Sequence, residues 1–223
     1  MACTASEKPL LLAFFQAGLR RVDGAQCTFS ALKDRSELVS VDVVAIGKAA
    51  GAMAQGAVRA LGNRIGRGLI ITKDRHLPGP GDVPEEFICR EAGHPLPDAR
   101  SLEAGALLLE FLHQQGGGGE WLFLISGGAS SLAEVLPDDI TLDALRALNR
   151  WLQSSGYSIS EANRVRKACS LIKGGQLAAH LGGRPARLLM ISDVEGNDPA
   201  TIGSGLLSPA FDEPELSGPG FPD

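Results

Sequence analysis

Short apolar runs recur along the chain, and each ends in Gly, Ser, Thr or charged residues. They are VDVVAIG (41–47), RGLIIT (67–72), EFICRE (86–91), WLFLIS (121–126) and ARLLMIS (186–192). Strands that are buried on both faces of a parallel sheet have this near-continuous apolar character. The pattern therefore predicts five buried strands at these positions.

Helical patterns fit between several of these strands. Asp98 is positioned to cap a helix over residues 99–115, which would end at the glycine run 116–119, a flexible turn. Ser158 and Glu161 have the spacing of a capping box, which predicts a helix over 158–173. On this helix Asn163, Arg166, Lys167 and Ser170 would lie within a few turns of one another.

The N-terminal stretch 10–22, LLLAFFQAGLRRV, predicts a helix with a broad apolar face. We expect this helix to pack on the flank of the domain. The C-terminal stretch 206–223 is rich in proline, glycine and acidic residues and lacks apolar periodicity, which is typical of a loose tail. The folded domain is therefore expected to span residues 1–205.

Strand and helix alternate along most of the chain, which predicts an α/β fold. The expected architecture is a three-layer αβα sandwich around a mostly parallel, Rossmann-like sheet, with ligands at the carboxyl ends of the strands. Lys48 follows the first strand, residues 126–130 follow the fourth, and Asp193 follows the fifth. These three polar groups are expected to converge on one edge of the sheet.

The loop after the fourth strand places Gly127 and Gly128 before Ser130 and Ser131. Backbone N–H groups and hydroxyls in such a loop can hold an anion, although strand-to-helix turns also use these residue types for geometry alone. Lys48 stands at a helix start, where the helix dipole disfavours a cation. A bound phosphate or a carboxylate would compensate the positive charge of Lys48. The alternative is that Lys48 is a surface lysine whose charged end reaches into water.

Asp193 ends the last strand and is followed by further acids. Such a residue can bind Mg²⁺, act as a general base, or only shape a turn. Arg166, Lys167 and Lys173 can form an anion site or a solvated helix face. His94 lies in a proline-stiffened loop, where a single histidine is usually structural.

Composition narrows the range of partners. The 223 residues carry a net charge of −5, and aromatic residues make up 5%, which disfavours nucleic acid as a partner and leaves a small anionic substrate open. Four cysteines are far apart and are expected to be reduced thiols. No signal-peptide pattern and no apolar run of about 20 residues is present, so we expect a cytoplasmic protein without membrane contact.

Five motifs occur in order between residues 10 and 205, namely GKAAGAMA, GHPLPDARS, LISGGASSL, NRVRKACSLIKGGQLA and ISDVEGNDPATIGSG. Together they resemble the N-terminal domain of the glycerate 2-kinase family. Members of that family have also been labelled hydroxypyruvate reductase, and they often end in a second domain called MOFRL. No counterpart of the MOFRL domain is present in this sequence.

The resemblance implies transfer of the γ-phosphoryl group of ATP to the 2-hydroxyl of D-glycerate, with Mg²⁺ as cofactor. It implies Lys48 and Asp193 as the catalytic pair, with Asp193 either accepting the hydroxyl proton or binding the metal. The remaining assignments are Ser126, Gly127, Gly128, Ser130, Ser131 and Lys173 for the nucleotide, and Asn163, Arg166 and Lys167 for the substrate.

Two positions depart from the family pattern. Ala129 replaces the third glycine of a usual Gly-Gly-Gly-Ser run, and Leu206 replaces a proline. In the family the second domain forms the other wall of the cleft. The sequence is compatible with a complete short protein, whose site a separate chain or self-association would complete, and with a truncated piece of a longer protein. A non-catalytic nucleotide- or anion-binding domain is the alternative function. An NAD(P)H-dependent hydroxypyruvate reductase is a third, although no G-x-G-x-x-G fingerprint follows the first strand.

Overall fold

The computed structural model describes residues 8–114 and 119–208. Its strands form one parallel sheet in the order β3-β2-β1-β4-β5. The strands are β1 (Val41–Ile46), β2 (Ile65–Lys73), β3 (Ile88–Ala92), β4 (Glu120–Ser126) and β5 (Ala186–Ile191). All five predicted strands are present, and the predicted α/β class with a parallel sheet is confirmed.

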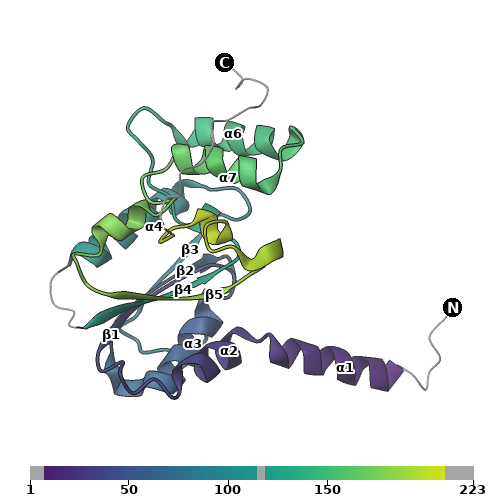
Figure 1. The fold of residues 1–223 in the computed structure, drawn as a ribbon, viewed down its shortest axis with the longest axis vertical. Coiled ribbons are helices and arrows are strands. Elements are labelled where there is room, and N and C mark those ends of the chain that lie inside the picture. The colour runs from purple at the N-terminus through teal and green to yellow at the C-terminus, as the bar shows by residue number, and fades with distance from the viewer. Residues whose placement is uncertain (1–7, 115–118, 209–223) are drawn as a thin grey trace.

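Helices cover both faces of this sheet (Figure 1). The α-helices are α1 (Lys8–Arg21), α2 (Gly24–Leu32), α3 (Ala50–Leu61), α4 (Ala99–His113), α5 (Ala129–Leu132), α6 (Leu142–Ser154) and α7 (Ile159–Ala168). Four 3₁₀ turns are η1 (Gly62–Arg64), η2 (Gln176–His180), η3 (Glu195–Asn197) and η4 (Ile202–Ser204). Because successive side chains of a strand point to opposite faces, β1 contributes to two separate hydrophobic cores.

Val43 and Ala45 of β1 pack with α2 and α3 on one face, where Met53 is fully buried. Val44 and Ile46 pack on the other face with α4, α5, η2 and η4. A third, small core joins α6 to α7, which lie together at the far side of the α4 layer (Figure 1). The sheet therefore lies between two helical layers, and the α6–α7 pair extends one of them.

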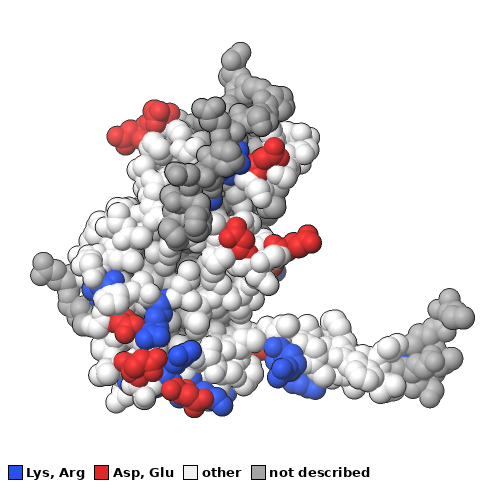
Figure 2. Space-filling model, viewed as in Figure 1, with Lys and Arg blue, Asp and Glu red and all other residues white. Residues whose placement is uncertain are grey.

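The N-terminal helix does not pack on the flank of the domain, so that prediction is wrong. Helix α1 forms where the pattern predicted a helix, but none of its residues is buried, and it projects away from the body (Figure 1). Its most exposed large side chains are Phe14 and Phe15. In Figure 2 most of the visible length of α1 is uncharged, with basic residues where it joins the body.

The helix predicted over 158–173 begins as expected and ends early. Glu161 accepts a hydrogen bond from the Ser158 N–H at 2.8 Å, and the Glu161 N–H donates to Ser158 Oγ at 3.3 Å, so the capping box is confirmed. The helix stops at Ala168, and the chain then turns inward. Ser170 and Lys173 are buried beyond the helix end, because both side chains bind a carboxylate in the interior.

Three further expectations concern residues that lie partly or wholly outside the described part of the chain. Leu206 is buried in the main core and Ser208 is also buried, so packing continues to the last described residue; residues 209–223 of the predicted tail lie outside the described part. The same holds for residues 116–118 of the predicted glycine turn and for Cys3. Among the described residues, no helix is long and apolar enough to cross a membrane.

Candidate active site

The three predicted polar groups meet because β1, β4 and β5 are neighbours in the sheet. In parallel strands, the carboxyl ends lie at one edge. There Lys48 Nζ lies 3.1 Å from Asp193 Oδ2, although 145 residues separate them in sequence. Both side chains remain 42–48% exposed, so the ion pair is open to a ligand.

Glycines allow the three strand ends to approach this closely. A Cβ atom on Gly127 would overlap the carboxylate of Asp193, and a Cβ on Gly47, whose φ is 134°, would overlap Ser126. A backbone hydrogen bond also joins the loops after β1 and β4, since the Lys48 N–H donates to the Gly127 carbonyl at 2.9 Å. The hydroxyl of Ser126 accepts a hydrogen bond from the N–H of residue 49 at 3.0 Å. Ser126 therefore holds the loop after β1 in place.

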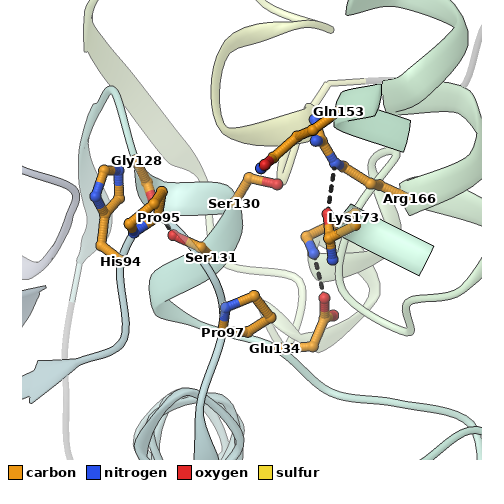
Figure 3. Close-up of a pocket in the computed structure, with 11 residues that line it drawn as sticks. His94, Pro95, Pro97, Gly128, Ser130, Ser131, Glu134, Gln153, Arg166 and Lys173 are labelled. Atoms are coloured by element: carbon orange, nitrogen blue, oxygen red, sulfur yellow. Dashed lines mark hydrogen bonds and ion pairs between the residues drawn. The ribbon is translucent and has the colours of Figure 1, made fainter. Parts of the chain in front are cut away.

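A pocket of about 230 Å³ opens at the glycine loop after β4, and Figure 3 shows the residues that line it. Its walls come from the loop after β3, from the loop and helix after β4, and from α6, α7 and the segment that follows α7. The lining residues are His94, Pro95, Pro97, Gly128, Ser130, Ser131, Glu134, Asn149, Gln153, Arg166 and Lys173. Gly128 lies both in the pocket wall and next to Lys48 of the ion pair. A Cβ atom added to Gly128 would lie only 3.2 Å from Lys48 Cγ.

Arg166 presents an oriented cation to this pocket. Its Nε donates to Asn149 Oδ1 at 3.0 Å, and one terminal nitrogen donates to Asn163 Oδ1 at 3.2 Å. Within residues 8–114 and 119–208, no carboxylate pairs with it, and burial lowers the pKa of the guanidinium from its usual value. A guanidinium held by two neutral amides retains donors for an anion.

A chain of hydrogen bonds connects Arg166 to the loop after β4. Ser130 Oγ lies 2.7 Å from Ser204 Oγ, and Ser204 Oγ lies 3.4 Å from Asn163 Oδ1, which also accepts from Arg166. The hydroxyl of Ser131 donates to the Gly128 carbonyl at 3.1 Å. The two serines thus have hydrogen-bond partners within the protein, and Ser130 couples the glycine loop to the cation.

Lys173 lies at the pocket floor, where Figure 3 shows it paired with Glu134. Lys173 is 2% exposed and Glu134 1%, and Ser170 Oγ donates to the other Glu134 oxygen at 2.6 Å. Burial lowers the pKa of Lys173, against the opposing effect of the carboxylate. Its charge is balanced inside the protein. Lys167 is half-buried and does not line this pocket.

Alanine at position 129 fits the loop without strain. The positive φ of the loop, 92°, falls on Gly128 and not on Ala129. Ala129 starts the single turn of α5 and is fully buried in the main core. The departure from the family pattern therefore leaves the backbone geometry of the loop intact.

His94 contacts this site, contrary to the purely structural role that its loop suggested. A Cβ on Gly128 would lie 2.8–2.9 Å from the imidazole, so the ring lies against the glycine loop. Burial lowers the pKa of His94, and the positive charges of Lys48 and Lys73 lower it further, whereas Asp193 opposes them. The ring is therefore expected to be neutral at pH 7.

We expect His94 to take up a proton only below its ordinary pKa of about 6.5. In Lys48→Met the pKa of His94 should rise, since one repelling cation is gone, but remain below the ordinary value because burial and Lys73 persist. A pH titration of the His94 ring signal by NMR measures both values. A pKa that is unchanged in the variant would show that Lys48 does not act on the ring.

Three polar residues of the pocket, apart from the histidine, were missed by sequence reasoning, although two of them carry a signal. Glu134 is the single acid in the apolar stretch SLAEVL, and Asn149 occupies a buried position at helical spacing between Leu145 and Leu152. A polar residue on a buried face usually has a polar partner, and here the partners are Lys173 and Arg166. Gln153 carries no such signal.

Comparisons with known proteins identify relatives of this chain. A D-glycerate 2-kinase from Thermotoga maritima is 40% identical over 169 residues, covering 76% of this chain and 40% of that protein. An Agrobacterium vitis protein with the provisional name hydroxypyruvate reductase is 37% identical over 202 residues, covering 90% and 44%. The chain thus spans less than half the length of these relatives.

Two crystal structures have the same fold. A glycerate kinase from Thermotoga maritima matches with a TM-score of 0.83 and 35% identity, over 92% of this chain and 49% of that one. A Pyrococcus horikoshii protein matches with a TM-score of 0.77 and 29% identity, over 94% and 49%. The profile of DUF4147, described as a domain of unknown function, matches residues 10–215. The chain therefore belongs to the DUF4147 family, and its relatives include glycerate 2-kinases.

Proposed function

We propose that this chain supplies the N-terminal half of a glycerate 2-kinase site, which transfers the γ-phosphoryl group of ATP to the 2-hydroxyl of D-glycerate. The observation that carries the proposal is the Lys48–Asp193 ion pair at the carboxyl edge of the sheet, beside a pocket that contains Arg166. The names of the Thermotoga maritima and Pyrococcus horikoshii relatives support it. The chain spans less than half the length of these relatives, so the other wall of the cleft would come from residues outside the 223 described by this sequence.

Arg166 binds the carboxylate of glycerate in this proposal. Its guanidinium is fixed by Asn149 and Asn163 and faces the pocket, and no carboxylate of the described residues pairs with it. Planar guanidinium groups bind carboxylates through two parallel hydrogen bonds, which fixes the orientation of the substrate as well as its position. The 2-hydroxyl would then be oriented relative to the reacting phosphoryl group.

Lys48 neutralises negative charge on the transferred phosphoryl group. Phosphoryl transfer depends mainly on positioning and electrostatic stabilisation, and a cation that is preorganised by Asp193 requires little reorganisation during the reaction. The neutral ring of His94 adds a hydrogen-bonding group next to it. Gly127, Gly128, Ser130 and the loop they form would contact the nucleotide phosphates.

Asp193 has one oxygen engaged by Lys48, and the other is available either for the hydroxyl proton or for Mg²⁺. Mg²⁺ is commonly held by one or two carboxylates together with nucleotide phosphates, so a single aspartate fits such a site. The described residues contain no cluster of three metal-binding side chains. Mg²⁺ would supply charge neutralisation between the phosphates. A changed Mg²⁺ dependence in Asp193→Asn would identify the metal-binding role.

The test is ADP release by the 223-residue chain with ATP, Mg²⁺ and D-glycerate, with the phosphoglycerate isomer identified by NMR. ADP that depends on glycerate, with 2-phosphoglycerate as product, supports the proposal. A folded protein that binds ADP without turnover supports the second candidate, a nucleotide- or anion-binding domain, for which the pocket beside the glycine loop with Arg166 also speaks. Oxidation of NADH with hydroxypyruvate would support a reductase instead.

Replacing Arg166 by Lys should raise the KM for D-glycerate about 10–100-fold with a smaller change in kcat. Lysine keeps the charge but loses the two-point contact, and a hydrogen bond to a charged group contributes about 1.5–3 kcal/mol. Initial rates at varied glycerate concentration measure the effect. Arg150→Lys, an exposed position on the neighbouring helix α6, is the matched control. An unchanged KM would remove Arg166 from the substrate site.

A further inference from the structure

Two histidines meet outside the candidate active site, on the main-core side of the sheet. His113 is the last residue of α4, and His180 is the last residue of η2. The His113 Nε2 and His180 Nδ1 atoms lie 3.1 Å apart, and the ring centroids are 5.2 Å apart with a tilt of 40°. Sequence reasoning assigned neither residue a role.

The distance between the two nitrogens matches that of two ligands on one metal ion. Bonds from imidazole nitrogen to Zn²⁺ are about 2.0–2.1 Å long, so two nitrogens 3.1 Å apart subtend an angle of about 100° at the ion. Neighbouring ligands of a tetrahedral or square-planar ion have angles close to this value. In the present contact a ring N–H points at the other nitrogen, so both rings have to rotate before their lone pairs point at a shared ion.

The local chemistry also favours a cation. His113 lies at the C-terminal end of the 15-residue helix α4, where the helix dipole attracts positive charge. Neutral imidazole nitrogens suit Zn²⁺, Ni²⁺ and Cu²⁺. In the present contact one ring donates its N–H to the other; on metal binding that ring carries its proton on the opposite nitrogen instead, so no net proton is released by a neutral pair.

We propose that His113 and His180 form a binding site for a divalent transition-metal ion of the zinc, nickel and copper class, with water completing the coordination. Glu110 lies one turn earlier on α4, but its carboxylate accepts a hydrogen bond from Gln114 at 3.3 Å. The described part of the chain holds no group of three metal-binding side chains. The protein thus contributes two ligands, and the site is independent of the proposed kinase reaction.

Metal binding here would join two elements that are distant in sequence. The ligands are 67 residues apart, and the helix and turn that carry them both pack in the main core, through Leu108 and Leu177. Because the unfolded chain does not hold the two rings together, the ion binds preferentially to the folded state and stabilises it. The bound ion would therefore cross-link α4 and η2.

The experiment is a Zn²⁺ titration of the 223-residue chain, followed by NMR of the histidine ring signals. The chain has four histidines, and the signals of His113 and His180 should shift together along one binding curve that fits one ion per chain. Thermal unfolding with Zn²⁺ in 100-fold excess over its Kd should show a midpoint raised by about 5 °C or more. Both responses should vanish in His113→Ala and in His180→Ala.

His76→Ala is the matched control, since His76 is also exposed and its ring contacts only the Asp74 backbone among the interactions described. This variant should keep both responses. Ring signals of His113 and His180 that do not move up to 1 mM Zn²⁺ (about the concentration of a weak site) would overturn the proposal. Shifts confined to His76 or His94, or a response retained in His113→Ala, would overturn it equally.

Discussion

Lys48→Met should lower the rate of glycerate-dependent ADP formation by about 10²–10³-fold, the effect expected when one preorganised charge-stabilising group is removed. Methionine keeps the apolar stem and deletes the charge that Asp193 holds at 3.1 Å. Because the charge acts mainly in the transition state, kcat should fall more than the affinity for glycerate. Steady-state kinetics of both proteins measure this difference.

Lys33→Met provides the matched control. Lys33 is also a half-exposed lysine near a carboxylate, that of Asp34, but it lies at the end of α2, before β1 begins, and does not line the pocket. Its replacement should leave kcat within twofold of the original. A folded Lys48→Met protein with unchanged turnover would eliminate this lysine from the reaction.

Glu134→Ala should destabilise the folded state by about 3–5 kcal/mol, because it leaves Lys173 buried without its partner. Unfolding midpoints of proteins of this size move by about 2–4 °C for each kcal/mol, so the melting temperature should fall by roughly 10 °C. Urea unfolding followed by circular dichroism measures the change. The same variant removes a side chain from the pocket floor, so ligand binding should weaken as well.

The double variant Glu134→Leu with Lys173→Met tests whether the instability of Glu134→Ala comes from the buried lysine that is left without a partner. Apolar residues of similar size remove both buried charges at once, and replacing a buried ion pair in this way is often neutral or stabilising. Its stability should exceed that of Glu134→Ala. Glu103→Ala, at an exposed position on α4, should change stability by less than about 0.5 kcal/mol. An equal loss of folding stability in Glu134→Ala and Glu103→Ala would contradict a stabilising role of the Glu134–Lys173 ion pair.

The strands and the meeting point of the catalytic candidates could be predicted from sequence, for a common reason. Strands buried on both faces are continuous apolar runs, and the residues that follow them must lie at the carboxyl edge of a parallel sheet. This reasoning brought Lys48 and Asp193 together without knowledge of strand order. The structure adds that β1, β4 and β5 are adjacent, which turns proximity into direct contact.

The roles of other site residues could not be predicted, because they depend on tertiary contacts that the sequence pattern does not show. Arg166 and Lys173 both read as basic residues of one segment, yet Arg166 faces the pocket with amide partners, whereas Lys173 is neutralised by Glu134, 39 residues earlier. The difference arises because the helix stops at Ala168 and the chain turns inward. Helix ends are set by such tertiary partners as much as by local propensity.

Helix α1 has a consequence for how the chain unfolds. A helix of about 12–15 residues is only marginally stable in water without tertiary packing, and α1 has 14 residues with none of them buried. Its melting is therefore nearly independent of the sheet, whose β1 strand is buried along its full length. The cooperative unit begins near Asp23, which caps α2, so a free energy of unfolding measured by denaturant reports on the body and not on α1.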